Sequence, residues 1–409
     1  MMCAHTHRFR RVFLAAAISA AGLVVGSTNA IADPSTLIST EVSYESKEHG
    51  IRFDTDFPGG KIDSLVEKKD HFEITIKPEL EPINDSAWYA FRVKADSERE
   101  IQVRLRYEGG SHRYAPKISR DRVNWESAEN LVVSRHPTGR EVTLNIPVGE
   151  KSLWVAGQEI VSEKEVGSWM KGLSTKPDVD QSVIGQSVLG NPLHRVAIGN
   201  PDAKDSIFIL SRQHPPEVTG TIGMMHFVDA INTDSNLAKK FRENFLTVIV
   251  PVANPDGVER GYWRSNANGV DLNRDWLRFT QPETKAIRDE MLTLRDRENG
   301  RLWLFLDFHS TFNEVFYTPP RETELFPPGF TTQWVAAIDK RMPAFEMLRD
   351  DGHNAHRSTS KAWVARELGI HAVTYEFGDE TQRDLIRDIA INSAEEMMRL
   401  LLERKADMQ

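Results

Sequence analysis

Hydrophobic and polar residues alternate along the first part of the chain, which predicts short β-strands. The alternation is clear in residues 71–77, 88–94, 101–107 and 142–146, and residues typical of turns separate these segments. Successive side chains of a strand point to opposite faces, so such runs fit strands with one buried face. We therefore expect residues 36–160 to form an all-β sandwich domain of antiparallel strands.

The pattern changes after a junction near residues 161–180, where continuous apolar runs begin to alternate with helical spacing. Buried strands are predicted at 206–211, 246–251, 302–308 and 372–375, and helices at 218–230, 282–297 and 384–404. Strands that alternate with helices are typical of a sheet covered by helices. Residues 165–405 are thus predicted to form an α/β domain, with a mixed, partly parallel sheet flanked by helices.

The N-terminus has the pattern of a secretory signal peptide. Arg8, Arg10 and Arg11 precede an apolar run over residues 12–26, and Ala30-Ile31-Ala32 offers a small-residue cleavage site. The apolar run is too short for a lasting transmembrane helix. We expect residues 1–32 to be removed between Ala32 and Asp33, giving a periplasmic or secreted protein with no stable membrane anchor.

Charge and cysteine content narrow the classes of partner. The net charge is −9 and no basic cluster interrupts the acidic composition, which argues against binding to nucleic acid or to anionic membrane surfaces. The only cysteine, Cys3, lies in the predicted signal peptide, so the remaining chain would fold without disulfides. The oligomeric state is left open by the sequence.

Candidate metal ligands follow two of the predicted strands. His214 and Glu217 come after the strand at 206–211, and His309 follows the strand at 302–308. In α/β sheets, ligands bind beyond the carboxyl ends of strands, where Glu376 also falls. A single His-x-x-Glu motif is a weak indication, because most chance instances are surface pairs. Two imidazoles and one carboxylate nevertheless suit a catalytic Zn²⁺ ion with a fourth position for water.

Further motifs accompany these residues, and the set resembles a known family. They are Asn254-Pro255-Asp256-Gly257, Arg264, the segment from Gly269 to Trp276, and Thr374-Tyr375-Glu376. Together with the candidate ligands they resemble the zinc carboxypeptidases of the carboxypeptidase A type. The spacing from Arg264 to Asn273-Arg274, and the β domain in front, are more similar to the branch called cytosolic carboxypeptidases, or deglutamylases.

The resemblance implies a function and a role for each matching residue. His214, Glu217 and His309 would hold one Zn²⁺, and the enzyme would hydrolyse the C-terminal residue of a peptide with a metal-activated water. Glu376 would be the general base and Arg264 would polarise the scissile carbonyl. Asn273 and Arg274 would bind the free terminal carboxylate of the peptide substrate, to which a guanidinium can make two parallel hydrogen bonds.

The chain also departs from the family pattern near the specificity pocket. No tyrosine lies between Tyr317 and Tyr375, although the family commonly places one over the substrate in this interval. Lys361, in the segment Ser360-Lys361-Ala362-Trp363, aligns with residues that line the pocket for the terminal side chain. A lysine there would favour a C-terminal Glu or Asp. The alternative is an exposed lysine on a loop.

Other interpretations compete with the peptidase. A zinc-dependent deacylase of N-acyl amino acids would use similar ligands and a similar carboxylate anchor, and a non-catalytic peptide-binding module would be expected to lack the base or a ligand. Arg274 could instead be a structural ion-pair partner of Asp271 or Asp275. Asp307 could orient a zinc-binding histidine or be a buried structural residue.

Overall fold

The computed structural model describes residues 41–80, 86–176, 178–298 and 300–408. The predicted signal peptide, residues 1–32, lies outside these ranges. Among the described residues, no helix combines the length and apolar character needed to cross a membrane.

The N-terminal strands form two sheets that share one hydrophobic core. Their orders are β1-β2-β5-β11-β7-β8 and β3-β4-β6-β10-β9, and every pair is antiparallel except β4 with β6. Alternate residues of each strand, such as Val103 and Leu105, fill the space between the sheets. The elements are β1 (Ser43–Ser46), β2 (Ile51–Asp54), β3 (Ser64–Glu67), β4 (Phe72–Ile76), β5 (Ala90–Ala95), β6 (Arg99–Tyr107), β7 (Lys117–Ser119), β8 (Trp125–Ser127), η2 (Glu129–Leu131), β9 (Val132–Arg135), β10 (Glu141–Val148) and β11 (Leu153–Ala156).

The remaining strands form one eight-stranded mixed sheet in the order β12-β13-β15-β14-β16-β19-β17-β18. The four central strands, β15, β14, β16 and β19, are parallel, while β13 and β17 join them antiparallel. The predicted mixed, partly parallel sheet is thus confirmed. The strands are β12 (Val179–Gln186), β13 (Pro192–Ile198), β14 (Asp205–Ser211), β15 (Phe245–Val250), β16 (Arg301–Thr311), β17 (Val315–Thr318), β18 (Leu348–Asp351) and β19 (His371–Gly378).

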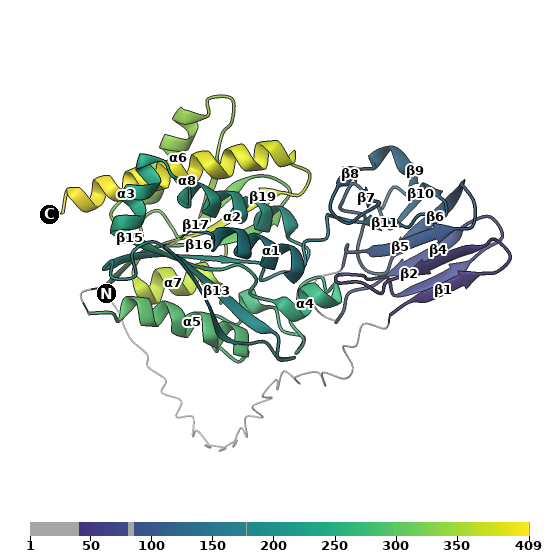
Figure 1. Cartoon of the computed structure of the whole chain (residues 1–409), viewed down its shortest axis with the longest axis horizontal. Coiled ribbons are helices and arrows are strands. Elements are labelled where there is room, and N and C mark those ends of the chain that lie inside the picture. The colour runs from purple at the N-terminus through teal and green to yellow at the C-terminus, as the bar shows by residue number, and fades with distance from the viewer. Residues whose placement is uncertain (1–40, 81–85, 177, 299, 409) are drawn as a thin grey trace, which may run out of the picture. The chain divides into compact units, whose positions relative to one another are not determined.

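Helices cover both faces of this sheet, because its central strands are apolar on both sides (Figure 1). Ile207 and Ile209 of β14 pack with α1, α2, α3, α6 and α8, whereas Phe208 and Leu210 pack on the other face, with α5 and α7. The helices are α1 (Glu163–Leu173), α2 (Val218–Ile231), α3 (Asn236–Asn244), α4 (Pro255–Arg260), η3 (Leu272–Arg274), α5 (Pro282–Arg295), α6 (Phe330–Arg341), α7 (Ser360–Leu368) and α8 (Arg383–Ala406).

Two strands are longer than their apolar runs predict, and this changes where the candidate site lies. The sequence places His309 and Glu376 just beyond strand ends, but β16 continues to Thr311 and β19 to Gly378. Both residues are therefore held inside strands rather than in loops. The predicted bounds of the two domains, 36–160 and 165–405, stay a prediction.

Candidate metal centre

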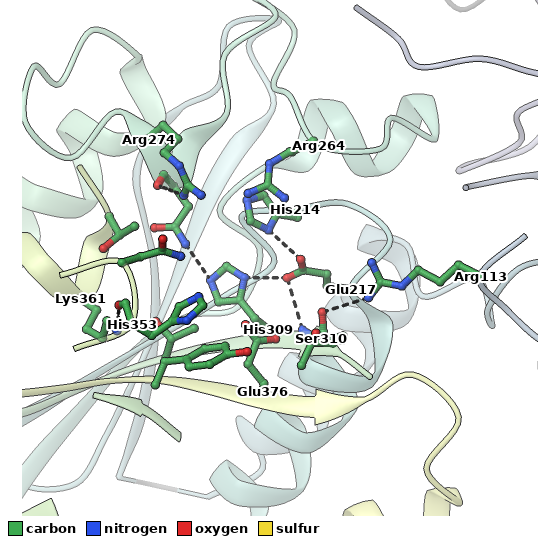
Figure 2. Close-up of a pocket in the computed structure, with 16 residues that line it drawn as sticks. Arg113, His214, Glu217, Arg264, Arg274, His309, Ser310, His353, Lys361 and Glu376 are labelled. Carbon is green, nitrogen blue, oxygen red and sulfur yellow. Dashed lines mark hydrogen bonds and ion pairs between the residues drawn. The ribbon is translucent and has the colours of Figure 1, made fainter. Parts of the chain in front are cut away.

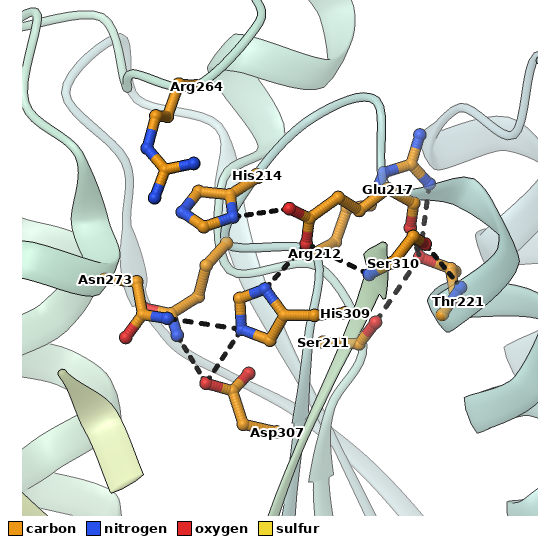
Figure 3. Close-up of polar contacts among 12 residues, drawn as sticks. Ser211, Arg212, His214, Glu217, Thr221, Arg264, Asn273, Asp307, His309 and Ser310 are labelled. Atoms are coloured by element: carbon orange, nitrogen blue, oxygen red, sulfur yellow. Dashed lines mark hydrogen bonds and ion pairs between the residues drawn. The ribbon is translucent and has the colours of Figure 1, made fainter. Parts of the chain in front are cut away.

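A tight turn between β14 and α2 positions His214 and Glu217. Arg212 has a positive φ of 60° and starts the turn, and its side chain is buried beneath it. The Arg212 Nε–H donates to Pro215 O at 2.6 Å and its Nη1 donates to Thr221 Oγ1 at 3.3 Å (Figure 3). Glu217 is the N-cap residue of α2, immediately before the helix begins at Val218. The buried guanidinium thus fixes the turn that carries both candidate ligands.

Helix α2 packs directly against the strand that carries His309. A Cβ on Gly220 would lie 2.3 Å from the carbonyl oxygen of His309, so only glycine fits at this position. The Gly220 N–H also donates to Ser310 Oγ at 2.9 Å. The close approach brings the start of α2, and with it Glu217, to the end of β16.

Strand pairing brings Glu376 next to His309. The two residues are opposite each other in the parallel pair formed by β16 and β19. Their neighbours Phe308, Tyr375 and Phe377 point into the core on the α2 side. Since side chains alternate along a strand, His309 and Glu376 both point to the opposite face, which is where α7 packs.

His214, Glu217 and His309 form one cluster whose ligand-type atoms all lie within 4.8 Å of one another. The Nδ1 atoms of His214 and His309 lie 2.7 and 2.6 Å from the two carboxylate oxygens of Glu217. Burial raises the pKa of Glu217, but the two imidazoles outweigh this and hold it well below its ordinary value. The carboxylate is thus ionised, as a metal ligand must be.

The outward nitrogens of both imidazoles face aspartates. His309 Nε2 lies 3.0 Å from Asp307 Oδ2 (Figure 3), and His214 Nε2 lies 3.1 Å from Asp271 Oδ1. A carboxylate at this position fixes the tautomer and orientation of a ligating imidazole. Of the two interpretations of Asp307, the geometry favours the orienting one. The same role of Asp271 was not predicted, because the only indication in the sequence is its place in the motif from Gly269 to Trp276.

Asp307 is itself held by a network of buried side chains. It accepts hydrogen bonds from Gln213 Nε2 at 2.6 Å and from the Ser360 hydroxyl. Gln213 in turn accepts from the Trp276 Nε1–H at 2.8 Å. The orientation of His309 is therefore tied to residues from four segments of the chain.

Glu376 lies beside this cluster, with only 9% of its surface exposed. Burial raises the pKa of its carboxyl to about 8, and the charges of Glu217 and Asp307 add to this rise while His309 opposes it. Among the described residues, nothing hydrogen-bonds to its buried Oε2 atom. Glu376 also lines the pocket, so its carboxyl group can exchange a proton with a molecule there.

The structure also brings the other predicted site residues to this pocket. Arg264 Nε donates to Asp271 Oδ2 at 2.6 Å, while Arg274 Nη1 donates to the backbone oxygen of Asn273 at 2.8 Å. Asn273 Oδ1 accepts from the Ser360 N–H at 3.0 Å. Asp271 therefore pairs with Arg264, and among the described residues no ion pair joins Arg274 to Asp271 or Asp275, which argues against the structural alternative for Arg274.

Lys361 is buried in α7, with 2% of its surface exposed, so it is not a lysine on an exposed loop. Its Nζ donates to His353 O at 2.6 Å and lies 5.8 Å from the centre of the Tyr317 ring. Burial lowers the pKa of this amine to about 8, although Asp350 and Glu376 act against the decrease. Tyr317, in β17, also lines the pocket and stacks on His353.

One pocket contains all eight predicted site residues, and its lining is unusually rich in cations for an acidic chain (Figure 2). Four Lys or Arg side chains face two Glu side chains. The lining residues are Arg113, His214, Glu217, Arg264, Asn273, Arg274, His309, Ser310, Thr311, Tyr317, His353, Asn354, Thr359, Lys361, Thr374 and Glu376. Arg264 and Arg113 each pair with an aspartate, whereas Arg274 and Lys361 form no ion pair among the described residues, so these two suit an anionic ligand.

The N-terminal β region contributes to the site through Glu79. Its Oε1 atom accepts hydrogen bonds from the Arg264 and Ser265 N–H groups at 2.7 and 2.8 Å, and its Oε2 atom accepts from the Trp263 N–H at 3.0 Å. One carboxylate thus binds three successive backbone amides of the loop that carries Arg264. The role of Glu79 was not predicted from the sequence, because no motif surrounds this residue.

The cluster fits a single zinc ion by its chemistry. Two neutral nitrogens and one carboxylate oxygen are the donors that zinc prefers, and three protein ligands leave a position open for water or substrate. The aspartates behind both imidazoles complete the surroundings expected of such a site. Residues 214, 217 and 309 would hold the ion.

Comparison with protein families gives two matches. The family described as zinc carboxypeptidase matches residues 166–398, which is more than half of the chain. The family described as cytosolic carboxypeptidase N-terminal domain matches residues 53–156. Both matches agree with the resemblance found in the sequence.

Curated relatives include cytosolic carboxypeptidase 3 of Mus musculus, which is 24% identical over 299 residues, covering 64% of this chain and 30% of that protein. Cytosolic carboxypeptidase 2 of Xenopus tropicalis is 34% identical over 146 residues, covering 32% of this chain and 15% of that protein. The chain therefore spans less than a third of the length of these relatives.

Solved structures share the fold. A metallo-carboxypeptidase from Burkholderia cenocepacia has a TM-score of 0.71 at 20% identity, covering 88% of this chain and 100% of its own. A metallo-carboxypeptidase from Pseudomonas aeruginosa, solved in complex with (2-guanidinoethylmercapto)succinic acid, has a TM-score of 0.70 at 20% identity, covering 86% of this chain and 99% of its own.

These comparisons correct the predicted location. The relatives named above are cytosolic carboxypeptidases, and residues 53–156 match the N-terminal domain of that group. They point to the cytoplasm, so the prediction of a periplasmic or secreted protein is wrong. That prediction depended on a short charged and apolar pattern in residues 1–32, which is a much weaker indication than a match over whole domains.

Proposed function

Because the chain belongs to the zinc carboxypeptidase family, we propose that it uses one zinc ion to remove the C-terminal residue of peptides and that it prefers acidic terminal residues. The observation that carries this proposal is the cluster of His214, Glu217 and His309 beside the buried carboxyl group of Glu376. A bound zinc ion would supply a Lewis acid that lowers the pKa of water towards about 7.

The protein's own residues divide the remaining chemistry. Glu376, as a carboxylate, takes the proton of the attacking water and returns it to the leaving amine. Arg264, fixed by Asp271 and by the Glu79 contacts to its loop, donates to the carbonyl oxygen as negative charge develops there. These groups stand on rigid strands or on a clamped loop, so little reorganisation is needed during the reaction.

Arg274 and Asn273 would bind the terminal carboxylate. The Arg274 guanidinium is half-buried in the pocket, and among the described residues it donates a hydrogen bond only through Nη1, which leaves donors for a carboxylate. The Asn273 Nδ2 lies 3.5 Å from His309 Nε2, so it stands next to the proposed metal ligands. Anchoring of a free carboxylate there restricts cleavage to the last peptide bond.

The proposed function predicts a difference between free and amidated peptides. The full chain loaded with zinc should release one residue from a peptide ending in a free carboxylate, while the same peptide with a C-terminal amide should react at least about 100-fold more slowly, because Arg274 loses its charged partner. Mass spectrometry of the products measures this. Equal cleavage of both forms, or hydrolysis only of N-acyl amino acids, would contradict the proposal.

Lys361 supports the acidic preference and makes it depend on pH. The charged amine stabilises a terminal Glu, and its pKa of about 8 means that this charge is present at pH 6–7 and is lost as the pH rises through 8. The ratio of kcat/KM for peptides ending in Glu and in Gln should therefore fall between pH 7 and pH 9. In Lys361→Met the ratio should be low at every pH, and a constant wild-type ratio would argue against this role.

A further inference from the structure

Arg113 brings a fourth cation into the pocket from the N-terminal β region. It lies between β6 and β7, in the segment that contacts the residues after β19. Its Nε–H donates to Asp379 Oδ2 at 2.7 Å and its Nη2 donates to Ser310 O at 3.4 Å. Ser310 directly follows the candidate ligand His309, so the Arg113 guanidinium is fixed close to the candidate metal ligands.

The position of Arg113 differs from that of the other cations. In Figure 2 it lies on the side of Glu217 that faces away from Arg274 and Lys361. Those two residues are assigned to the terminal carboxylate and the terminal side chain. A peptide whose C-terminal residue is held by Arg274 and Lys361 must extend past the candidate metal ligands and away from these two residues. The residue before the scissile bond would then approach Arg113.

The surroundings of Arg113 form a shaped subsite. The guanidinium lies 5.5 Å from the centre of the Trp263 ring and 5.0 Å from that of Phe312. Phe312 is 72% exposed, which is rare for a phenylalanine and leaves an apolar surface beside the charge. Among the described residues, nothing hydrogen-bonds to Nη1 of Arg113. The subsite thus offers a fixed cation with a free donor next to an exposed ring.

We propose that Arg113 binds the side-chain carboxylate of the penultimate residue, with the stem of that side chain resting on Phe312. The enzyme would then recognise two consecutive acidic residues, the last through Lys361 and the one before it through Arg113. This inference rests on the proposed function, because it needs the peptide to lie in the pocket in the stated direction.

A purely structural role for Arg113 makes a different prediction. Lys117 belongs to the same segment and pairs with Glu380 at 2.6 Å, but it does not line the pocket. If Arg113 only joined the β region to the residues after β19, its replacement and that of Lys117 would have similar effects on every substrate. A subsite role instead predicts an effect that depends on the penultimate residue.

The test uses the full chain loaded with zinc and two peptides that both end in Glu and differ only in the penultimate residue, Glu or Gln. For the wild type we expect kcat/KM to be about two- to fivefold higher with penultimate Glu, a size typical of a partly exposed charge pair. Arg113→Gln should bring the ratio close to one, mainly by slowing the Glu peptide. Arg113→Lys should keep part of the ratio, and Lys117→Gln should keep all of it.

Two results would overturn the inference. One is a wild-type ratio of one, and the other is an equal loss on both peptides in Arg113→Gln. If that variant does not fold, the wild-type ratio and its decrease in Arg113→Lys decide the matter, since a lysine keeps the charge but not the planar geometry that fixes the guanidinium. Cleavage without discrimination would leave the proposed function intact, whereas no cleavage of any peptide would overturn both.

Discussion

Replacing Glu376 by glutamine is expected to lower kcat by about 10²–10⁴-fold, the usual range for a general acid–base group, and to leave zinc binding unchanged. Glutamine has the same shape but cannot take a proton. The wild-type carboxyl is buried with a raised pKa and has no hydrogen-bond partner for Oε2 among the described residues. It is therefore a base that can both accept and return a proton.

Rate and metal content must be measured together for this variant. Steady-state kinetics give kcat, and elemental analysis after dialysis gives the zinc content. Glu243→Gln, an exposed position on α3, makes the same chemical change away from the pocket and should behave like the wild type. A Glu376→Gln enzyme with wild-type turnover would rule out this residue as the base.

Replacing Glu217 by glutamine is expected to have the second large effect, a loss of zinc and of activity together. Glu217 is the only carboxylate of the cluster, and both imidazoles contact it. Changes behind the ligands typically cost about 10–100-fold in metal affinity, so the loss of a ligand should cost more. Asp307→Asn, which alters only the support of His309, serves as the milder comparison.

Zinc content after dialysis against a weak chelator measures this prediction. The expected order of retained zinc is wild type, then Asp307→Asn, then Glu217→Gln. Adding zinc should restore activity to chelated wild-type protein and to Asp307→Asn, but not to Glu217→Gln. Full zinc retention and full activity in Glu217→Gln would show that the cluster is not the metal site.

The central sheet could be predicted because its strands are apolar on both faces. The runs at 206–211 and 302–308 correspond to β14 and β16, and they place His214 and His309 near the carboxyl ends of these parallel strands. Strand β12 was missed because most of its residues are exposed and it has no apolar alternation. The predicted end of β16 was also too early, because the polar residues His309 and Ser310 continue the strand and are buried in the site.

The supporting residues of the site could not be predicted because their partners are distant in sequence. Asp271 contacts His214 across 57 residues, and Glu79 contacts Arg264 across 185 residues. Neither contact leaves a local pattern, since a single carboxylate on a loop usually faces solvent. Lys361 could be assigned only by alignment with the family, and its burial depends on the packing of α7 against β16 and β19.

The contacts of Glu79 mean that the catalytic region depends on the N-terminal β region for the conformation of the loop that carries Arg264. A truncated catalytic fragment would retain all three candidate metal ligands. The backbone amides of residues 263–265 would lose their acceptor, however, and the side chain of Arg264 would no longer be held in one position. Such a fragment would still chelate zinc while turning over poorly. The β region therefore has a direct part in holding the catalytic loop.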